Sequence, residues 1–247
     1  MKPLSILVTG GSGTIGSSLL KNLQTLPHLR LTVISHAKTD ISSSKSLSQV
    51  GGQFDVVIHL AASLRMFEKN HELENTNIKG LLNILQAFCT SSKPIKFIFA
   101  SSIDAITKNS DYALTKVKGE GIVRQFAQDH PNVTYLNLRI GNVYKKQPEE
   151  LVSLPSWRRS LLYYELSDKK VFPIRLQDLV LKIRDFALDP KINNKTLDLF
   201  EDGISVKNII KPTPQRLPFG RLILWFWISL GKILNKGDRV IYLSLEK

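Results

Sequence analysis

The chain has 247 residues, 43% of them hydrophobic, so it can bury one substantial core, or one core with a small appended lobe. This composition argues against a disordered protein, and the single cysteine, Cys89, excludes an internal disulfide framework. The five histidines show no metal-ligand spacing, and the first apolar run is too short for a signal peptide. We therefore expect no metal site and a cytoplasmic, reducing location.

The formal net charge of +13 requires a partner, and the candidates are a nucleic acid, an anionic membrane surface or a phosphorylated small molecule. Residues 207–247 carry +6 of this charge without any recognisable nucleic-acid-binding module, so we expect no nucleic-acid partner. Within this tail, the apolar run 222–230 is too short to span a bilayer. Residues 216–239 therefore either pack onto the main domain or a second subunit, or lie peripherally on the inner face of the membrane.

The first elements in chain order are a buried strand from residue 4, a glycine-rich turn, and a helix with apolar residues at helical spacing. The turn follows the pattern T-G-x-x-G-x-x-G, in which the glycines allow a tight turn, close approach of a pyrophosphate and close packing of helix on strand. The helix N-terminus would offer amide groups and a partial positive charge to the phosphates. The alternative is a plain turn between strand and helix without a ligand. The predicted dinucleotide-binding residues here are Thr9, Gly10, Gly11, Ser12, Gly13, Thr14, Ile15 and Gly16.

The second strand, 30–35, ends without the carboxylate that would bind the ribose 2′-hydroxyl of NAD. Ser35, His36 and Lys38 follow instead and could accept the 2′-phosphate of NADP, although a solvated Lys38 is an equally good interpretation. We expect NADP to be slightly favoured over NAD. Asp40 is a candidate for the adenine amino group, with Ile41 beside it.

The rest of the chain alternates between apolar strands and amphipathic helices. Strands are expected over 54–62, 96–102 and 133–144, and helices over 75–91, 112–129 and from about Asp178 to 188. This alternation predicts an α/β fold with a doubly wound parallel sheet, whose ligands bind at the carboxyl ends of the strands. Residues 61–63, 101–102 and 141–144 fall at such ends.

Seven segments, in order along residues 4–210, carry a resemblance to the extended short-chain dehydrogenases/reductases of the nucleotide-sugar epimerase, dehydratase and reductase kind. They are VTGGSGTIG, DVVIHLAA, NTNIKGLLNIL, FIFASSIDAI, YALTKVKGE, LRIGNVY and IRLQDLV. The resemblance implies a Rossmann domain over 1–144 and a reduced C-terminal substrate lobe over 145–247, interleaved with it. It also implies cofactor contacts from Leu60, Ala61, Ala62 and Asn77.

The resemblance makes Tyr112 the catalytic acid/base, Lys116 its partner and a ligand of the nicotinamide ribose, and Ser102 the hydroxyl that polarises the substrate. Residues i and i+4 share one face of a helix, so Lys116 can lie beneath Tyr112. We expect the ammonium group, together with the nicotinamide charge, to lower the tyrosine pKa toward neutrality. An amphipathic helix with a solvated Lys116 and a packed Tyr112 is the alternative.

The implied activity is NAD(P)-dependent epimerisation or reduction of a nucleotide-activated sugar in polysaccharide biosynthesis, by a chain that could form a homodimer. The implied substrate-binding residues are Ser63, Ser102 and Asn142. Arg158 and Arg175 are candidates to bind a nucleotide pyrophosphate through their guanidinium groups, and the alternative is that each is a solvated charge. Ser102 precedes Tyr112 by only ten residues, where the family usually has about two dozen. The shortened segment 103–111 keeps a second interpretation open, a non-catalytic dinucleotide-binding sensor or scaffold module.

Overall fold

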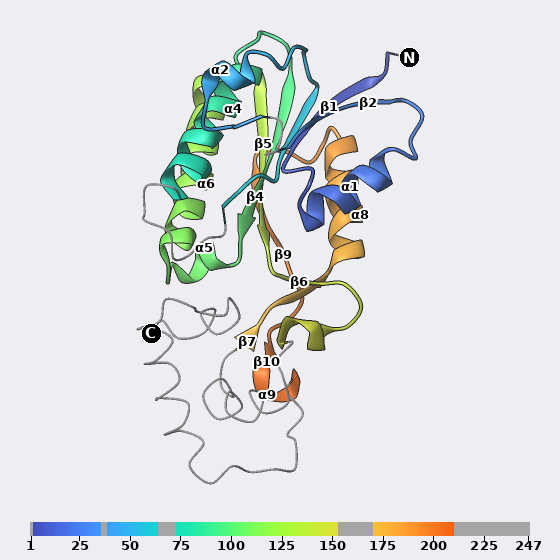
Figure 1. Ribbon diagram of the computed structural model, residues 1–247, viewed down its shortest axis with the longest axis vertical. Coiled ribbons are helices and arrows are strands. Elements are labelled where there is room, and N and C mark those ends of the chain that lie inside the picture. The colour runs from blue at the N-terminus through green and yellow to red at the C-terminus, as the bar shows by residue number, and fades with distance from the viewer. Residues whose placement is uncertain (1, 36–38, 64–72, 153–169, 210–247) are drawn as a thin grey trace. The chain divides into compact units, whose positions relative to one another are not determined.

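The computed structural model describes residues 2–35, 39–63, 73–152 and 170–209 (Figure 1). Internal contacts divide the chain into two compact units. The first unit comprises Met1–Ile140 with Leu176–Leu199, and the second comprises Gly141–Arg175 with Phe200–Lys247. The C-terminal half of the chain thus contributes a helix and a strand to the first unit.

A six-stranded sheet forms the centre of the first unit, and all of its strand pairs are parallel. In spatial order the strands are β2 (Leu29–Ile34), β1 (Leu4–Thr9), β3 (Val56–His59), β4 (Ile95–Ser102), β5 (Val133–Ile140) and β9 (Lys195–Leu199). The chain runs outward from β1 to β2 and then returns to place β3 on the other side of β1. In such a sheet the ligand crevice lies outside the carboxyl ends of the strands at this reversal, here the ends of β1 and β3. The predicted doubly wound parallel sheet is confirmed.

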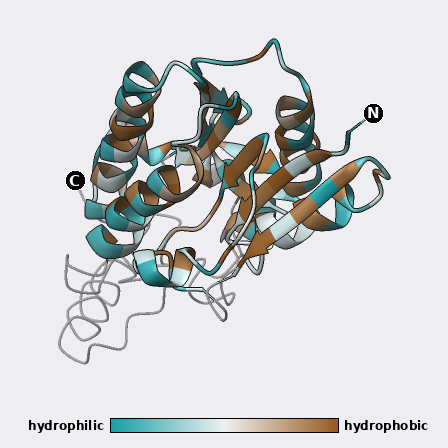
Figure 2. Cartoon of the chain, turned by 90° about the horizontal axis from the view of Figure 1, so that it is seen from above, coloured by the Kyte–Doolittle hydropathy of each residue, from teal (hydrophilic) through white to brown (hydrophobic). Residues whose placement is uncertain are grey.

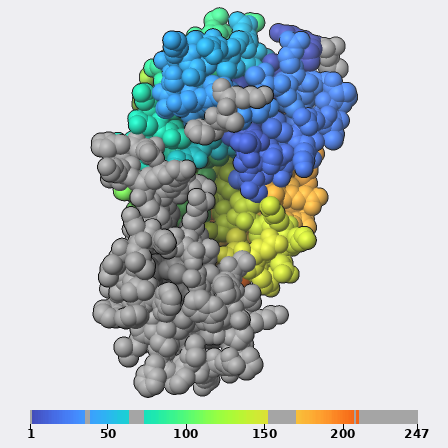
Figure 3. All heavy atoms as spheres, viewed as in Figure 1, coloured from blue at the N-terminus to red at the C-terminus, as the bar shows by residue number. Residues whose placement is uncertain are grey.

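Helices cover both faces of this sheet (Figure 1). Helix α1 (Thr14–Leu23) packs with α8 (Leu176–Leu188) on one side, and α2 (Ser44–Leu47), α4 (Gly80–Phe88) and α6 (Asp111–Asp129) lie on the other. In Figure 2 the strands of the sheet are coloured mostly brown, for hydrophobic residues, and the helices around them carry both brown and teal residues. On the face seen in Figure 3, the N-terminal segment of the chain, in blue, forms much of the surface of the first unit.

One hydrophobic cluster of the first unit lies between the sheet and helices α4 and α6. Every residue of β3 and β4 is buried, as is typical of central parallel strands. Phe97 and Phe99 of β4 are among the largest fully buried side chains, and they belong to the same cluster as Leu81 and Leu85 of α4. This packing fixes the helices on the strands whose ends carry the predicted site.

Two predicted elements are divided in the structure. The expected helix 75–91 begins as a π-helix, Asn75–Lys79, and continues as α4 only from Gly80. The expected strand 133–144 stops at Ile140 and resumes as β6 (Asn142–Tyr144). At the break, a Cβ on Gly141 would lie 2.2 Å from the carbonyl oxygen of Phe172, so only glycine allows this close approach of two backbones.

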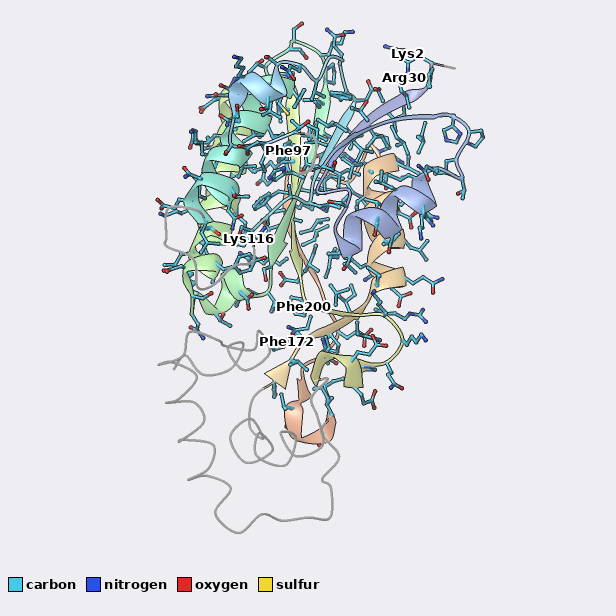
Figure 4. All side chains as sticks on the ribbon, viewed as in Figure 1. Lys2, Arg30, Phe97, Lys116, Phe172 and Phe200 are labelled. Carbon is cyan, nitrogen blue, oxygen red and sulfur yellow. The ribbon has the colours of Figure 1, made fainter. Side chains whose placement is uncertain are left out.

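The second unit is built from short elements. Strand β6 pairs in parallel with β8 (Pro173–Arg175), and β7 (Lys170–Val171) pairs antiparallel with β10 (Ile204–Ser205). A 3₁₀ helix, Pro148–Val152, and the short helix α9 (Val206–Ile209) complete its described part. The rings of Phe172 and Phe200 meet edge to face, 5.4 Å apart (Figure 4). None of the described helices, in either unit, is both long and apolar enough to cross a bilayer.

Candidate active site

The glycine-rich turn after β1 forms a cradle that only glycines can build. Gly10 has φ +71°, and a Cβ there would lie 2.7 Å from the amide nitrogen of Ala61. A Cβ on Gly16 would lie 2.3 Å from the carbonyl oxygen of Gly10. Gly13 caps α1 with no side-chain hydrogen bond, which leaves the first amides of the helix available to an anion. The cradle therefore fits the pyrophosphate of a dinucleotide.

Thr9 and His59 connect the ends of β1 and β3 beneath this cradle. The hydroxyl of Thr9 lies 2.9 Å from Nδ1 of His59 and accepts a hydrogen bond from the amide of Ala61 at 3.2 Å. Both side chains are buried. Thr9 was predicted as a cofactor ligand, but its hydroxyl points into the protein. There it holds the backbone of Ala61 beside the glycine turn through a hydrogen bond.

Asn77 lies within the π-helix and joins three segments of the first unit. Its Oδ1 accepts from the amide of Ser63 at 2.8 Å, and its Nδ2 donates to the carbonyl of Ser63 and to Oγ1 of Thr115. The wider turn of a π-helix is frequent at functional sites, where it redirects a side chain. Here it turns Asn77 toward both the loop after β3 and helix α6, which carries the predicted acid/base.

Helix α6 presents Tyr112 and Lys116 on one face. The N-terminus of the helix is stabilised by its N-cap residue, Ser110, whose side chain accepts a hydrogen bond from the amide of Ala113 at 3.1 Å. Lys116 is only 4% exposed, so the alternative of a solvated lysine is wrong. Its Nζ donates to the carbonyl oxygen of Ala100 at 2.7 Å and lies 5.5 Å from the centre of the Tyr112 ring. Figure 4 shows Lys116 directed from α6 toward the sheet.

Ser102, at the end of β4, reaches Tyr112 despite the short connection between them. Helix α5 (Asp104–Thr107) begins two residues after Ser102, and Lys108 then turns the chain with a φ of +57°. The side chain of Ser102 lies close enough to that of Tyr112 for hydrogen bonding with it to lower the pKa of the tyrosine. The segment 103–111 therefore brings the two hydroxyls together in nine residues.

Asp104 also belongs to this group, and the sequence analysis missed it. Ser102 Oγ donates to Oδ2 of Asp104 at 3.1 Å, and the amide of Asp104 donates back to Ser102 Oγ at 3.2 Å. Asp104 lies outside the Ser, Tyr and Lys pattern on which the prediction relied. The spacing Ser-x-Asp, which favours such a local side-chain turn, was the available signal.

The expected fall of the tyrosine pKa is wrong for the chain by itself. Burial and the charge of Asp104 raise the pKa of Tyr112, and hydrogen bonding with the Ser102 side chain only partly opposes them. Burial also lowers the pKa of Lys116 to about 8, against the charge of Glu120, which raises it. Burial thus also disfavours the charged form of Lys116, the group that was expected to lower the tyrosine pKa.

Other predicted site residues are not among the groups that meet around Tyr112 in the described part of the structure. His36, Lys38, Arg158 and the segment 216–239 fall outside the described residues. The carboxylate of Asp40 accepts hydrogen bonds from the amide and the hydroxyl of Ser42. Asn142 and Arg175 belong to the second unit, where Oδ1 of Asn142 accepts from the amide of Phe172 at 3.0 Å.

Two curated proteins of related sequence match parts of the chain. The chain is 35% identical over 124 residues to a UDP-N-acetyl-alpha-D-glucosaminuronate decarboxylase of Bacillus cytotoxicus, covering 42% of this chain and 38% of the relative. It is 22% identical over 168 residues to the capsular polysaccharide biosynthesis protein CapD of Staphylococcus aureus, covering 56% of this chain and 28% of the relative. The chain therefore spans less than two fifths of the length of these relatives.

Solved structures share the fold. A UDP-glucose 4-epimerase of Thermotoga maritima, solved with UDP-glucose, aligns with a TM-score of 0.67 and 21% identity over 84% of this chain and 80% of the epimerase. RMD of Pseudomonas aeruginosa, solved with NADPH, aligns with a TM-score of 0.67 and 17% identity over 84% and 81%. The model of the NAD dependent epimerase/dehydratase family matches residues 6–186, so the chain belongs to that family.

Proposed function

We propose that the chain is an NAD(P)-dependent epimerase or reductase that acts on a nucleotide-activated sugar by hydride transfer. The observation that carries this proposal is the meeting of Ser102, Tyr112 and Lys116 at the carboxyl end of β4, within the same sheet whose β1 end forms the glycine cradle. A site that only bound a dinucleotide would need the cradle but not the three catalytic groups. The decarboxylase relative and the UDP-glucose 4-epimerase that shares the fold, solved with UDP-glucose, support the substrate class.

The cradle from Gly10 to Gly16 would hold the pyrophosphate, and Lys116 the ribose hydroxyls of the nicotinamide half. The nicotinamide would supply the hydride acceptor or donor. Tyr112 would exchange a proton with the sugar oxygen at the reacting carbon, and Ser102 would hydrogen-bond to the same oxygen. Because burial and Asp104 raise the pKa of Tyr112, its deprotonation requires additional positive charge close to the hydroxyl.

The test is turnover of a panel of sugar nucleotides with both dinucleotides, using Tyr112→Phe as the matched variant. This change removes the proton-transferring hydroxyl and keeps the ring, so we expect turnover to fall at least about a hundredfold with dinucleotide affinity nearly unchanged. Lys116→Met should reduce both turnover and dinucleotide affinity. Wild-type turnover in Tyr112→Phe would overturn the acid/base assignment.

The competing function is a non-catalytic dinucleotide-binding sensor or scaffold, which the short 103–111 segment keeps open. It predicts calorimetric dinucleotide binding without turnover of any sugar nucleotide. The contact between Ser102 and Tyr112 favours the enzyme, because a sensor has no need to bring two hydroxyls together.

We also propose that NADP(H) binds at least as well as NAD(H), because no carboxylate stands at the end of β2 and Ser35, His36 and Lys38 follow it. Titration of both dinucleotides at low and physiological ionic strength, with Lys38→Ala as the control, tests this choice. A clear preference for NAD(H) that Lys38→Ala does not change would contradict it.

A further inference from the structure

Glu120 is a buried carboxylate on the catalytic face of α6, one turn beyond Lys116 and two beyond Tyr112. Both of its oxygens have partners. Ser101 Oγ donates to Oε1, and the guanidinium of Arg139 binds the carboxylate with both Nε, at 2.9 Å, and Nη2, at 2.8 Å. Asp198 lies 3.9 Å from the outer side of the same guanidinium. A carboxylate on the helix is therefore joined to β4, β5 and β9.

On β4, the contact of Glu120 lies between the residue that Lys116 contacts and Ser102. Ser101 immediately precedes Ser102, and Ala100, which precedes Ser101, accepts the hydrogen bond from Lys116. Helix α6 is thus attached to consecutive residues of β4 through Lys116 and Glu120. A displacement of α6 along β4 would break both contacts and separate Tyr112 from Ser102. The contacts of Glu120 therefore fix the register on which the candidate site depends.

Glu120 also provides the negative charge that acts on Lys116. From β3, His59 faces the lysine as a neutral ring, since burial and the lysine's own charge lower the pKa of His59 to about 3. From β5, the guanidinium of Arg139 binds the carboxylate of Glu120. The charge of Asp104 raises the pKa of Tyr112. Glu120 is thus the carboxylate that raises the pKa of Lys116, against a larger lowering by burial.

We propose that Glu120, held by Ser101 and Arg139, is a positioning residue that keeps Lys116 cationic and fixed beneath Tyr112. This role rests on the proposed function, because the charge on Lys116 has a purpose only where Tyr112 exchanges protons. Removal of the carboxylate charge should leave the lysine buried with no counter-charge, and its proton should then be lost at a lower pH.

The test follows the titration of Lys116 directly, by NMR of protein labelled with ¹³C at lysine Cε, with the resonance assigned through its loss in Lys116→Met. In the wild-type chain we expect the transition near the pKa of about 8, well below that of exposed lysines. Glu120→Gln keeps the shape and removes the charge, so we expect the midpoint to fall by about one pH unit or more.

Two variants serve as matched controls. Glu120→Asp keeps the charge and should restore most of the wild-type midpoint. Ser101→Ala removes one hydrogen bond to the carboxylate but no charge, so its midpoint should stay close to that of the wild type. A Glu120→Gln midpoint equal to that of the wild type would overturn the proposal and leave Glu120 a structural residue.

Arg139→Gln covers the case in which Glu120→Gln does not fold. It removes the cation that partly neutralises Glu120, so we expect the Lys116 midpoint to move upward, opposite to Glu120→Gln. An unchanged or lower midpoint contradicts the proposal. Neither substrate nor dinucleotide enters these titrations, so a failure of the proposed function would appear as absent turnover with the lysine shifts intact.

Discussion

At the scale of single residues, the polar groups buried beneath the candidate site determine how the protein responds to pH. His59 lies fully buried in β3 and stacks with Phe97 and Phe99 at ring distances of 6.1 and 6.0 Å. Its Nε2 has no hydrogen-bond partner among the described residues. Burial first, and then the charge of Lys116, lower its pKa from 6.5 to about 3. Folding therefore requires the neutral imidazole.

The first consequence is a loss of stability in mild acid. The folded-state pKa lies below the unfolded one, so the stabilisation is complete above pH 6.5 and declines as the pH falls toward 3. We expect His59 to lower the free energy of unfolding by about 2 kcal/mol between pH 7 and pH 5. Urea unfolding of His59→Phe, whose ring matches its stacking neighbours, should show a shallower dependence than the wild type in this range.

The exposed His28 provides the control for this measurement. His28→Phe removes a histidine from the surface and should leave the dependence of stability on pH as in the wild type. A wild-type slope in His59→Phe would show that other groups govern acid unfolding.

At the scale of elements, the turn between β1 and α1 depends on a glycine that touches backbone. A Cβ at Gly16 would lie 2.3 Å from the carbonyl oxygen of Gly10 and 2.9 Å from Cα of Gly11. Backbone atoms cannot move aside as a flexible side chain can, so the helix would have to leave the turn. Because the same turn forms the candidate pyrophosphate cradle, packing and binding should fail together.

Gly16→Ala is accordingly expected to lower the free energy of unfolding by about 1–3 kcal/mol and to weaken dinucleotide binding at least about tenfold. Gly51→Ala is the matched substitution, since a Cβ at Gly51 meets nothing within 4 Å. It should change stability by less than about 1 kcal/mol and leave binding unchanged. Equal effects of the two substitutions in urea unfolding and calorimetry would contradict the role given to the cradle.

At the scale of the whole molecule, a ligand that binds only the folded sheet must stabilise it. The strand ends that form the candidate cofactor site come from β1 and β3, which meet only when the parallel sheet is assembled. An unfolded chain therefore offers no such site. At a hundredfold excess over its dissociation constant, a dinucleotide should add about 2.7 kcal/mol to the free energy of unfolding.

Thermal unfolding with increasing NADP(H) or NAD(H) measures this effect, and the melting temperature should rise with the logarithm of the concentration. Gly16→Ala should show a smaller rise at equal concentration, since its cradle is blocked. A melting temperature that stays constant in both dinucleotides would argue against a cofactor site in this chain.

The sequence by itself was enough for the architecture and for the placement of Tyr112 and Lys116 on one face of α6. Apolar strands alternating with amphipathic helices specify a parallel sheet, because each helix must bury one stripe and each strand both faces. The four-residue spacing of Tyr112 and Lys116 places them on one helical face, and the glycine spacing predicts the turn, because both depend on local geometry. The family resemblance added the roles of these residues.

Tertiary structure decided what depends on residues distant in the chain. Gly141 ends β5 because the backbone of Phe172 approaches it, and the π-helix turns Asn77 toward both Ser63 and Thr115. The hydrophobic periodicity of one segment does not predict which distant residues will contact it. For the same reason the burial of Lys116, the rise in the pKa of Tyr112 and the contacts of Glu120 with Ser101 and Arg139 emerge only in the folded chain, since desolvation and charge act through space.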